Sequence, residues 1–445
     1  MGIQGLLQVL QPVTRKQHVS AYKGEKVGID TYCWLHRGAY SCSEELCQNI
    51  PTYRHIRYCI KMVQMLLYYE VKPVLVFDGA NLPMKEGQEI QRAARREEAK
   101  KKAAFLLANG KRSAARDAFA QAVNITPQMA YCLIEELKRL NHPDIEVIVA
   151  PYEADAQLAY LGQTGYIHAV ITEDSDLIPY GTPRVLYKMS RTGEGEEVEL
   201  SRLGDMPEPM PFADWSLDMF RHVCILSGCD YLDSLEGIGL KTAYLLYKRC
   251  GKDLEKVLRS LNTVLRHKYN VPPDYTDRFQ QADYTFRHQR VYDPLSQKLV
   301  TLTPLECDDP VLAAFPSLDF LGKDVDPRTA TAIALGKIDP TTWEPFQPMP
   351  SMAQFEASSS SSASSSFSED ASFTNRGGGQ RLKRSRTEPT LQPRNSITNY
   401  FAKLTASASA SSAAFQRKRP TSSHARSKLP RSSSAPLSSQ SKSSV

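Results

Sequence analysis

Acidic residues recur as pairs spaced two apart in one stretch of the chain. Glu153 and Asp155 follow an apolar run at residues 147–149, and Asp174 and Asp176 follow another at residues 169–172. Carboxylates gathered in one crevice repel one another, and proteins usually offset this repulsion by binding hard divalent cations there. One acid after a strand more often caps a helix or solvates a loop, whereas two pairs favour a metal site.

The two apolar runs are rich in β-branched residues, so we expect strands there, with a helix at residues 154–161 between them. A strand, helix, strand unit implies a parallel pair, and parallel sheets bind ligands beyond the carboxyl ends of their strands. Asp174 and Asp176 can face one site if the chain stays extended beyond Thr172. Glu153 and Asp155 would diverge on a regular helix, and so need the irregular backbone that Pro151 suggests.

Two earlier segments repeat this arrangement. Residues 26–30 read as a strand that ends in Asp30, and residues 72–79 as another strand that ends in an acid, Asp78, with an amphipathic helix at about residues 53–69 between them. Four predicted strands therefore deliver acids at their carboxyl ends, which strengthens the prediction of a metal site.

A strongly basic segment follows Asp78 closely. Residues 85–116 hold ten Lys or Arg and four Glu, and Lys85, Arg92, Arg96 and Lys100 share one helical face. Such a run is often only a solvated helix surface. Its position beside the acidic crevice favours a helix that holds a phosphate backbone against the metals.

Residues 216–250 read as a helix, a glycine-containing turn and a second helix, with Asp230 in the turn. Gly237 and Gly239 precede the second helix, where backbone N–H groups can approach a phosphate. The glycines alone usually mean a tight turn. Together with the nearby Lys241, they favour an anchor for the DNA backbone without sequence preference. Residues 251–345 continue with helical patterns and no evident chemistry.

Charge and composition divide the 445 residues in two. Residues 371–445 carry 14 Lys or Arg against one acid, while the remainder has a formal charge of −7. The nine scattered cysteines, with no metal-binding spacing and no evident secretory signal, indicate a reduced compartment, the cytosol or nucleus. No apolar run reaches the length of a membrane span, so we expect no membrane association.

From about residue 354 the chain is rich in Ser and Ala, which predicts disorder. Residues 381–386 form a basic cluster suited to nuclear import, although a solvated charge run is the plainer interpretation. Ile397, Tyr400 and Phe401 have the spacing of a small docking turn, although isolated hydrophobic residues are common in such tails.

The motifs MGIQGLL, VGIDTYCWLH, VFDGANLP, APYEADAQLAYL, ITEDSDL and ILSGCDYL…GIGLKTA occur in this order. Together they resemble the flap-endonuclease family of structure-specific 5′ nucleases over residues 1–345. The start MGIQGLLQ, the segment ANLPMKEGQEIQRAARREE and FRHVCILSGCDYL favour its exonuclease branch over the branch of flap endonuclease proper.

The resemblance implies an α/β fold, with a PIN-like, mostly parallel sheet flanked by helices, a helical arch, a helix-two-turn-helix element and a disordered C-terminal tail. The expected regions are an N-terminal nuclease region at 1–99 that includes the start of the arch, arch helices or linker at 100–137 and an internal nuclease region at 138–215. The helix-two-turn-helix and the end of the nuclease domain follow at 216–345, and a Ser-rich basic tail at 350–445.

The resemblance also assigns residues to roles. The metal carboxylates match Asp30, Asp78, Glu153, Asp155, Asp174, Asp176 and Asp230, and Lys85, Arg92 and Asp174 are the expected catalytic residues. The expected DNA contacts are Tyr32, His36, Lys85, Arg92, Arg95, Arg96, Gly237, Gly239 and Lys241. Ser227, Ser234 and Ile238 match the family's monovalent-cation site, which implies K⁺, and Gly2 matches its characteristic start beside the active site.

The implied function is a Mg²⁺-dependent 5′→3′ exonuclease on double-stranded DNA with 5′-flap endonuclease activity, in DNA repair in the nucleus. Two Mg²⁺ ions would serve each active site, with Mn²⁺ as a substitute. Implied partners are DNA with 5′ ends, nicks or flaps, mismatch-repair proteins, and a sliding clamp bound through Ile397, Tyr400 and Phe401. In the clamp-binding segment, Arg394 stands where the family's usual Gln belongs.

Three alternatives remain open at this point. The chain could be a flap endonuclease of replication, a catalytically silent DNA-binding scaffold or a PIN-like ribonuclease. The full set of seven acids disfavours a silent scaffold, and the basic segment with the GIG helix pair disfavours a small RNA nuclease.

Overall fold

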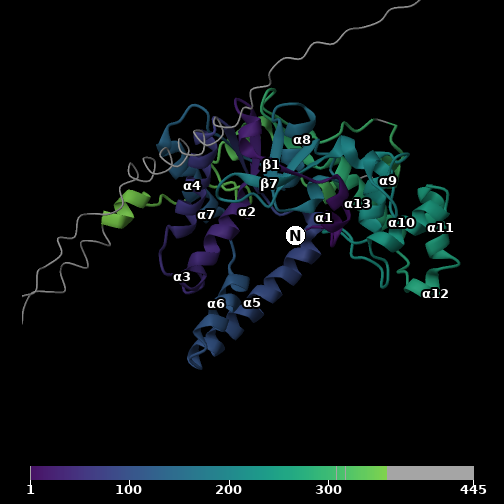
Figure 1. Ribbon diagram of the computed structural model, residues 1–445, viewed down its shortest axis with the longest axis horizontal. Helices are drawn as coiled ribbons and strands as arrows, with labels where there is room; N and C mark the ends of the chain where they lie inside the picture. The colour runs from purple at the N-terminus through teal and green to yellow at the C-terminus, as the bar shows by residue number, and fades with distance from the viewer. Residues whose placement is uncertain (1, 307, 316, 358–445) are drawn as a thin grey trace, which may run out of the picture. The chain divides into compact units, whose positions relative to one another are not determined.

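The computed structural model of the protein describes residues 2–306, 308–315 and 317–357. A seven-stranded sheet with the order β1-β7-β6-β5-β2-β3-β4 lies at its centre (Figure 1). Strands β2 to β6 are parallel, whereas β7 and β1 are antiparallel at one edge. The strands are β1 Arg15–His18, β2 Lys26–Asp30, β3 Lys72–Phe77, β4 Glu146–Val149, β5 Ala169–Thr172, β6 Arg184–Tyr187 and β7 Glu194–Glu199. The predicted α/β class with a mostly parallel sheet is confirmed.

The chain order of the strands reverses next to β2. From β2 the sheet grows through β3 and β4 on one side, and then through β5 and β6 on the other. Register pairs Asp30 of β2 with Val76 of β3, and Val27 with Ala169 of β5, so the carboxyl ends of these strands meet at one edge. A reversal of this kind leaves a crevice where α/β proteins bind ligands.

Helices cover both faces of the sheet, because alternate residues of the buried strands point to opposite sides. In β3, Val74 and Val76 pack with one core cluster, and Leu75 and Phe77 pack with another. The first cluster includes residues of α1 Leu6–Val9, α8 Ala154–Gln163, α9 Leu217–Leu226, α10 Leu240–Arg249, α11 Leu254–Asn262 and α13 Tyr275–His288. The second includes residues of α2 Thr31–Ala39, α4 Arg54–Tyr68 and α7 Pro127–Leu140.

The basic segment forms two helices rather than one. Helix α5 Glu86–Ala108 and helix α6 Arg112–Ala122 make a hairpin that projects from the sheet and its helices (Figure 1). The chain reverses at Gly110, which has a φ of +73° that favours glycine. Ala103, Ala115 and Phe119 are buried between the two helices, and α6 also packs against α3 Ser43–Cys47. We call this hairpin the arch.

The remaining elements lie mainly around the helix-two-turn-helix. Helices α9 and α10 flank its turn, and α11, α12 Arg266–Tyr269 and α13 lie on the same side of the molecule in Figure 1. The hairpin of β8 Arg290–Asp293 and β9 Lys298–Thr301 follows, and then α14 Pro310–Ala314 and α15 Pro327–Ala334. No helix in the described part of the chain is both long and apolar enough to cross a bilayer.

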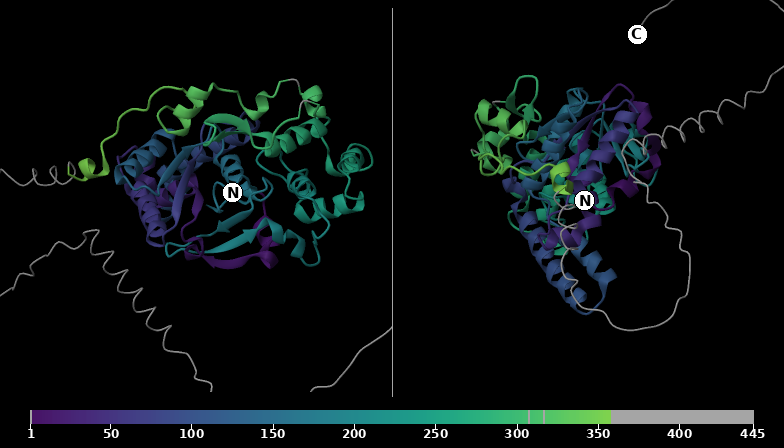
Figure 2. Two further views of the ribbon diagram at one scale, coloured as in Figure 1. Left: turned by 90° about the horizontal axis from the view of Figure 1, so that it is seen from above. Right: turned by 90° about the vertical axis from the view of Figure 1, so that its left-hand side faces the viewer.

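The expected disorder from residue 350 is wrong for its first residues. Residues 352–357 are helical, and the segment from α15 to this helix runs along the surface to reach α4 and α7 (Figure 2). Phe346 stacks on Tyr131 of α7 at a centroid distance of 4.6 Å, and Phe355 packs against Tyr53 at 5.1 Å. Apolar contacts therefore hold this stretch despite its polar composition. Residues 358–445, including the clusters at 381–386 and 397–401, lie outside the described residues.

We predict that Phe355→Ala lowers the free energy of unfolding by about 1–3 kcal/mol, less than a fully buried Phe would, because its ring is only partly buried. Chemical denaturation measures the change. Leu295→Ala is the matched control, since Leu295 is 80% exposed and its truncation should change stability by less than about 0.5 kcal/mol. Equal effects of the two substitutions would show that residues 345–357 do not stabilise the fold.

Candidate active site

The predicted acids lie at one edge of the sheet, at the reversal of strand order. Asp30 ends β2, and Asp78 directly follows β3 and accepts a hydrogen bond from the Ala154 N–H at 2.8 Å. That bond ties the end of β3 to the start of α8, which carries two further acids. The others are Glu153 and Asp155 at the start of α8, Asp174 and Asp176 after β5, and Asp230 in the turn after α9.

The local backbone explains how each pair points into one site. Glu153 is the N-cap of α8 and has an extended backbone (φ −89°, ψ 136°), whereas Asp155 lies in the first helical turn. The predicted irregular backbone before this helix is therefore present. The chain stays extended after β5 only as far as Asp174, because a 3₁₀ turn, η5 Ser175–Leu177, begins directly after it, so the condition on which this pair was expected to face one site is not met. The Asp176 N–H donates to Asp174 Oδ1 at 3.1 Å, so a capping bond keeps that pair together.

The start of the chain packs directly on the second pair. The Ile3 N–H donates to Asp176 Oδ1 at 2.9 Å. Gly2 has a φ of +74°, and a Cβ atom there would lie 2.1 Å from Asp174 Oδ1 and 2.4 Å from Asp176 Oδ1. Only glycine can occupy this position without displacing the two carboxylates.

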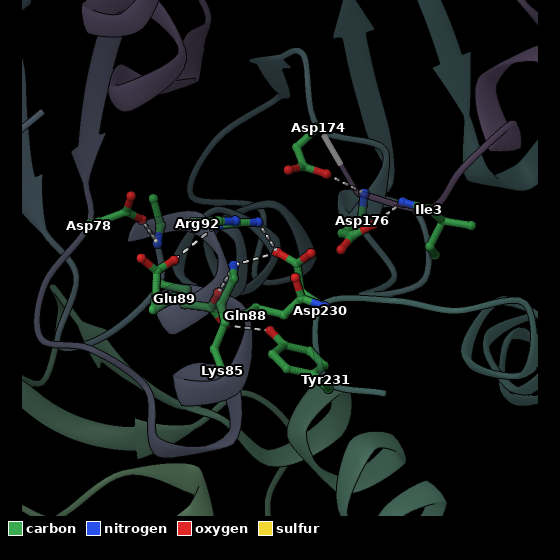
Figure 3. A network of polar contacts seen from close by, with 12 residues as sticks. Ile3, Asp78, Lys85, Gln88, Glu89, Arg92, Asp174, Asp176, Asp230 and Tyr231 are labelled. Atoms are coloured by element: carbon green, nitrogen blue, oxygen red, sulfur yellow. Dashed lines mark hydrogen bonds and ion pairs between the residues drawn. The ribbon is translucent and has the colours of Figure 1, made fainter. Parts of the chain in front are cut away.

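Lys85 and Arg92 enter the acidic site from the base of the arch (Figure 3). Lys85 Nζ lies 2.8 Å from Asp230 Oδ2 and also forms an ion pair with Glu153. Arg92 donates to Asp230 Oδ2 at 2.7 Å and to Glu89 at 3.0 Å. The side chain of Lys85 is only 16% exposed, so its charge acts in a poorly screened environment.

Burial and the nearby cations shift the pKa values of the acids in opposite directions. Burial raises the pKa of Asp78 to about 7, and raises those of Asp155 and Asp176 well above their usual range, with the charge of Asp174 adding to both. Burial alone would also raise the pKa of Asp230, but the charges of Lys85 and Arg92 outweigh it and lower that pKa. The site thus holds several acids whose negative charge is not balanced by the protein.

This donor set suits a hard divalent cation. As they stand, no three His, Cys, Asp or Glu side chains among the described residues converge closely enough to hold an ion. The carboxylate oxygens are nevertheless the ligands that Mg²⁺ prefers. Burial raises the pKa values of Asp155 and Asp176, and the neighbouring charge of Asp174 raises them further, so a bound cation would favour the ionised form of both acids.

The other expected DNA-contacting residues are spread around this site. Tyr32 is half-buried on α2, with the charge of Asp78 close enough to add to the burial that raises its pKa, and His36 is exposed in the last turn of α2. Arg95 and Arg96 on α5 do not reach the acids, because they contact Gln91 and Glu89 instead.

The helix-two-turn-helix residues lie on the turn between α9 and α10. Gly239 is the N-cap of α10, Gly237 has a φ of +82°, and Lys241 is exposed in the first turn of the helix. In the predicted monovalent-cation site, Ser227 donates to the Cys224 carbonyl, Ile238 is buried, and Ser234 packs against the Ser227–Gly228 turn. Convergence of Ser227, Ser234 and Ile238 on one ion stays a prediction.

Sequence reasoning missed residues that hold the acids. Thr172 donates to Asp30 Oδ2 at 2.8 Å and accepts from the Asp174 N–H at 3.0 Å, so it links two strands. Gln289 donates to Glu153 Oε2 at 2.9 Å from a region where we expected no chemistry. Thr172 ends a predicted strand and could have been singled out, but no pattern connects Gln289 with an acid 136 residues away.

Fold and site together define an α/β protein with an acidic crevice at the carboxyl edge of its sheet and a basic helical arch beside it. The pattern of the XPG N-terminal domain matches residues 1–99, and that of the XPG I-region matches residues 144–230. "Exonuclease 1" of Arabidopsis thaliana is 44% identical over 351 residues, covering 78% of this chain and 45% of that protein. "DNA damage-inducible protein DIN7" of Saccharomyces cerevisiae is 34% identical over 302 residues, covering 68% of this chain and 69% of that protein.

The chain belongs to the XPG/Rad2 family, and its similarity to exonuclease 1 confirms the branch expected from its motifs. It spans less than half the length of the Arabidopsis relative. Among solved structures, the catalytic core of Rad2 in complex with DNA substrate superposes with a TM-score of 0.47 and 18% identity, covering 73% of this chain and 88% of that one. This similarity is too weak to transfer a ligand or a residue role.

We predict that the protein without divalent cations loses stability as the pH rises from about 4 to about 7, where Asp78 ionises, and loses more as Asp155 and Asp176 ionise at higher pH. The pKa values of Asp78, Asp155 and Asp176 are higher in the folded protein than in the unfolded chain. At a pH between the two values, the folded protein therefore binds more protons than the unfolded chain. The free energy of unfolding falls across that range and stops falling once the pH has passed the folded-state pKa. Melting temperatures in chelator measure the effect. Mg²⁺ should flatten the pH dependence, and an equally steep fall with Mg²⁺ present would contradict the assignment.

We predict that Gly2→Ala weakens binding of Mg²⁺ by at least about tenfold, because the added Cβ displaces Asp174 and Asp176. The Mg²⁺-induced rise in melting temperature provides the measurement. Gly5→Ala is a matched control, since Gly5 also has a positive φ of +79° but has no atom within 4 Å of the added Cβ. If both variants responded to Mg²⁺ alike, backbone strain rather than the clash with the acids would be the cause.

Proposed function

We propose that the protein is a divalent-metal-dependent 5′→3′ exonuclease on double-stranded DNA that also cuts 5′ flaps. The observation that carries this proposal is the meeting of Lys85 and Arg92 with Glu153 and Asp230 at the carboxyl edge of the sheet. A basic arch that reaches into an acidic site can hold a phosphodiester beside bound cations. The exonuclease 1 relatives point to the same reaction.

The acids and the two cations would have different roles in hydrolysis. Asp174, Asp176, Asp155 and the other acids would hold two Mg²⁺ ions, or Mn²⁺ in their place, which activate the attacking water and stabilise the leaving 3′ oxygen. Lys85 and Arg92 would exchange their carboxylate partners for the scissile phosphate and stabilise its developing charge, a role commonly worth about 3 kcal/mol per donor. In the protein alone, Lys85 pairs with Glu153 and Asp230, Arg92 pairs with Asp230, and the two cations lower the pKa of Asp230.

Duplex DNA would be held outside the active site. The turn between α9 and α10, with Gly237, Gly239 and Lys241, offers backbone N–H groups and positive charge to phosphates, and K⁺ at Ser227, Ser234 and Ile238 would add to this grip. Tyr32 and His36 on α2 would contact the DNA beside Asp30. Arg95 and Arg96 would contact the phosphate backbone along the arch.

We also propose a nuclear location through residues 381–386, clamp binding through Ile397, Tyr400 and Phe401, and mismatch-repair proteins as partners. Binding of a peptide spanning residues 394–401 to a sliding clamp tests the second of these directly, because Arg394 departs from the family pattern. A peptide with Tyr400→Ala and Phe401→Ala is the control.

The proposed reaction is tested with duplexes that carry a recessed 5′ end, a nick or a 5′ flap, and with a matched RNA. We expect Mg²⁺-dependent release of nucleotides from 5′ ends of DNA and no cleavage in chelator. Cleavage of flaps alone would favour a flap endonuclease of replication. Cleavage of RNA alone would favour a ribonuclease, and DNA binding without cleavage a silent scaffold.

We predict that Asp174→Ala reduces cleavage by about a thousandfold or more, because one metal position loses a ligand, while binding of duplex DNA changes little. Single-turnover cleavage and DNA binding in Ca²⁺ measure the two properties separately. Asp144→Ala, a substitution of an exposed acid before β4, should leave both unchanged. Normal turnover of the Asp174 variant would remove the metal assignment.

A further inference from the structure

Glu153 differs from the other acids in how its two oxygens are used. Oε2 accepts a hydrogen bond from the Tyr231 hydroxyl and another from Gln289 Nε2, at 2.9 Å. Oε1 accepts from the ammonium group of Lys85. One oxygen is therefore occupied by two neutral donors, and the other by a cation from the base of the arch.

The neutral donors belong to a small buried network that can be oriented from first principles. A carboxylate only accepts, so the single Tyr231 hydroxyl proton points to Glu153. The bond between the hydroxyls of Tyr180 and Tyr231 must then have Tyr180 as its donor. Gln289 donates its amide N–H to Glu153, and its amide oxygen lies 3.5 Å from the Tyr180 hydroxyl as a second, more distant acceptor for the Tyr180 proton. The protons of Tyr231 and Gln289 thus both point to Glu153.

Packing holds the network in place. Tyr180, Tyr231 and Gln289 are 3%, 5% and 0% exposed. The rings of both tyrosines meet Phe286 of α13 nearly edge-on, at centroid distances of 4.8 and 5.0 Å. Gln289 is the C-cap of the same helix, and its carbonyl accepts from the Leu302 N–H at 2.9 Å. Water cannot readily replace donors that are buried and fixed in this way.

We propose that Tyr231 and Gln289, supported by Tyr180, act as positioning residues that leave Glu153 only Oε1 to offer to a metal ion. This inference rests on the proposed metal-dependent function. Mg²⁺ and Mn²⁺ suit single-oxygen ligation in a six-coordinate shell, whereas the larger Ca²⁺ takes six to eight oxygens and accepts both oxygens of one carboxylate. The network therefore favours Mg²⁺ and Mn²⁺ over Ca²⁺ at this site.

The network also connects the acidic site with the helix-two-turn-helix region. Tyr231 directly follows Asp230 in the turn after α9, and α13 packs against α9. A change in that turn would reach Glu153 through the Tyr231 hydroxyl. Because Lys85 contacts the other oxygen, Glu153 lies between the arch and the element proposed to hold the duplex.

The test compares metal binding by Tyr231→Phe with that of the unaltered protein, in the absence of DNA. Binding of Mn²⁺ is measured by electron paramagnetic resonance, and binding of Ca²⁺ by its displacement of Mn²⁺. We expect Mn²⁺ affinity to fall about tenfold and Ca²⁺ affinity to fall less or not at all, because freeing Oε2 permits two-oxygen ligation. The preference for Mn²⁺ over Ca²⁺ should therefore decrease, by up to about tenfold where Ca²⁺ affinity is unchanged.

Tyr284→Phe is the matched control. Tyr284 is also a buried tyrosine, and its hydroxyl donates to a carboxylate, that of Asp309, at 2.5 Å. It should lose a comparable amount of stability without any change in metal preference. If Tyr231→Phe does not fold, Gln289→Met provides the same readout.

The possible outcomes separate the two proposals. A folded Tyr231→Phe variant with an unchanged ratio of Mn²⁺ to Ca²⁺ affinity would overturn the positioning role, even if its melting temperature fell. Failure of the unaltered protein to bind Mn²⁺ would instead overturn the proposed metal-dependent function. Mn²⁺ binding and DNA cleavage by the unaltered protein, with loss of metal preference in the variant, would support both.

Discussion

Repulsion among carboxylates is the constraint on which this structure depends. The parallel strands bring acids from four places in the chain to one buried edge, where burial and mutual charge raise the pKa values of Asp155 and Asp176. Lys85 and Arg92 offset part of that charge, and lower the pKa of Asp230. The start of the arch therefore stabilises the acidic site, because Lys85 and Arg92 form ion pairs with Glu153 and Asp230 there.

The two ends of the acidic site are held by different means. On one side, backbone groups position the carboxylates: the Ile3 N–H donates to Asp176, and Gly2 packs closely against Asp174 and Asp176. On the other side, side chains position them, because Tyr231 and Gln289 donate to one oxygen of Glu153. Directional hydrogen bonds of this kind restrict the rotation of a carboxylate side chain, and in proteins that bind metal ions such supporting bonds increase metal affinity.

Segments away from the acidic site pack against the helices that cover the sheet. The two antiparallel helices of the arch pack together through Ala103, Ala115 and Phe119. The second of them, α6, also contacts α3, and this contact attaches the arch to the α/β core. The helix at residues 352–357 returns to α4 and α7, the helices that cover one face of the sheet. Phe346 and Phe355 supply the aromatic contacts of this stretch, with Tyr131 and Tyr53.

The amino-acid order alone was enough for the sheet class, the strands that end in Asp30 and Asp78, the basic segment and the family, because these depend on local periodicity and on short contiguous motifs. Local pattern did not indicate the 3₁₀ turn after Asp174, where a capping bond decides the backbone, or the helix at residues 352–357, where packing decides it. The partners of the acids could not be foreseen. Lys85 with Glu153, Thr172 with Asp30 and Gln289 with Glu153 are contacts between residues 68, 142 and 136 positions apart, and only the folded chain brings them within hydrogen-bonding distance.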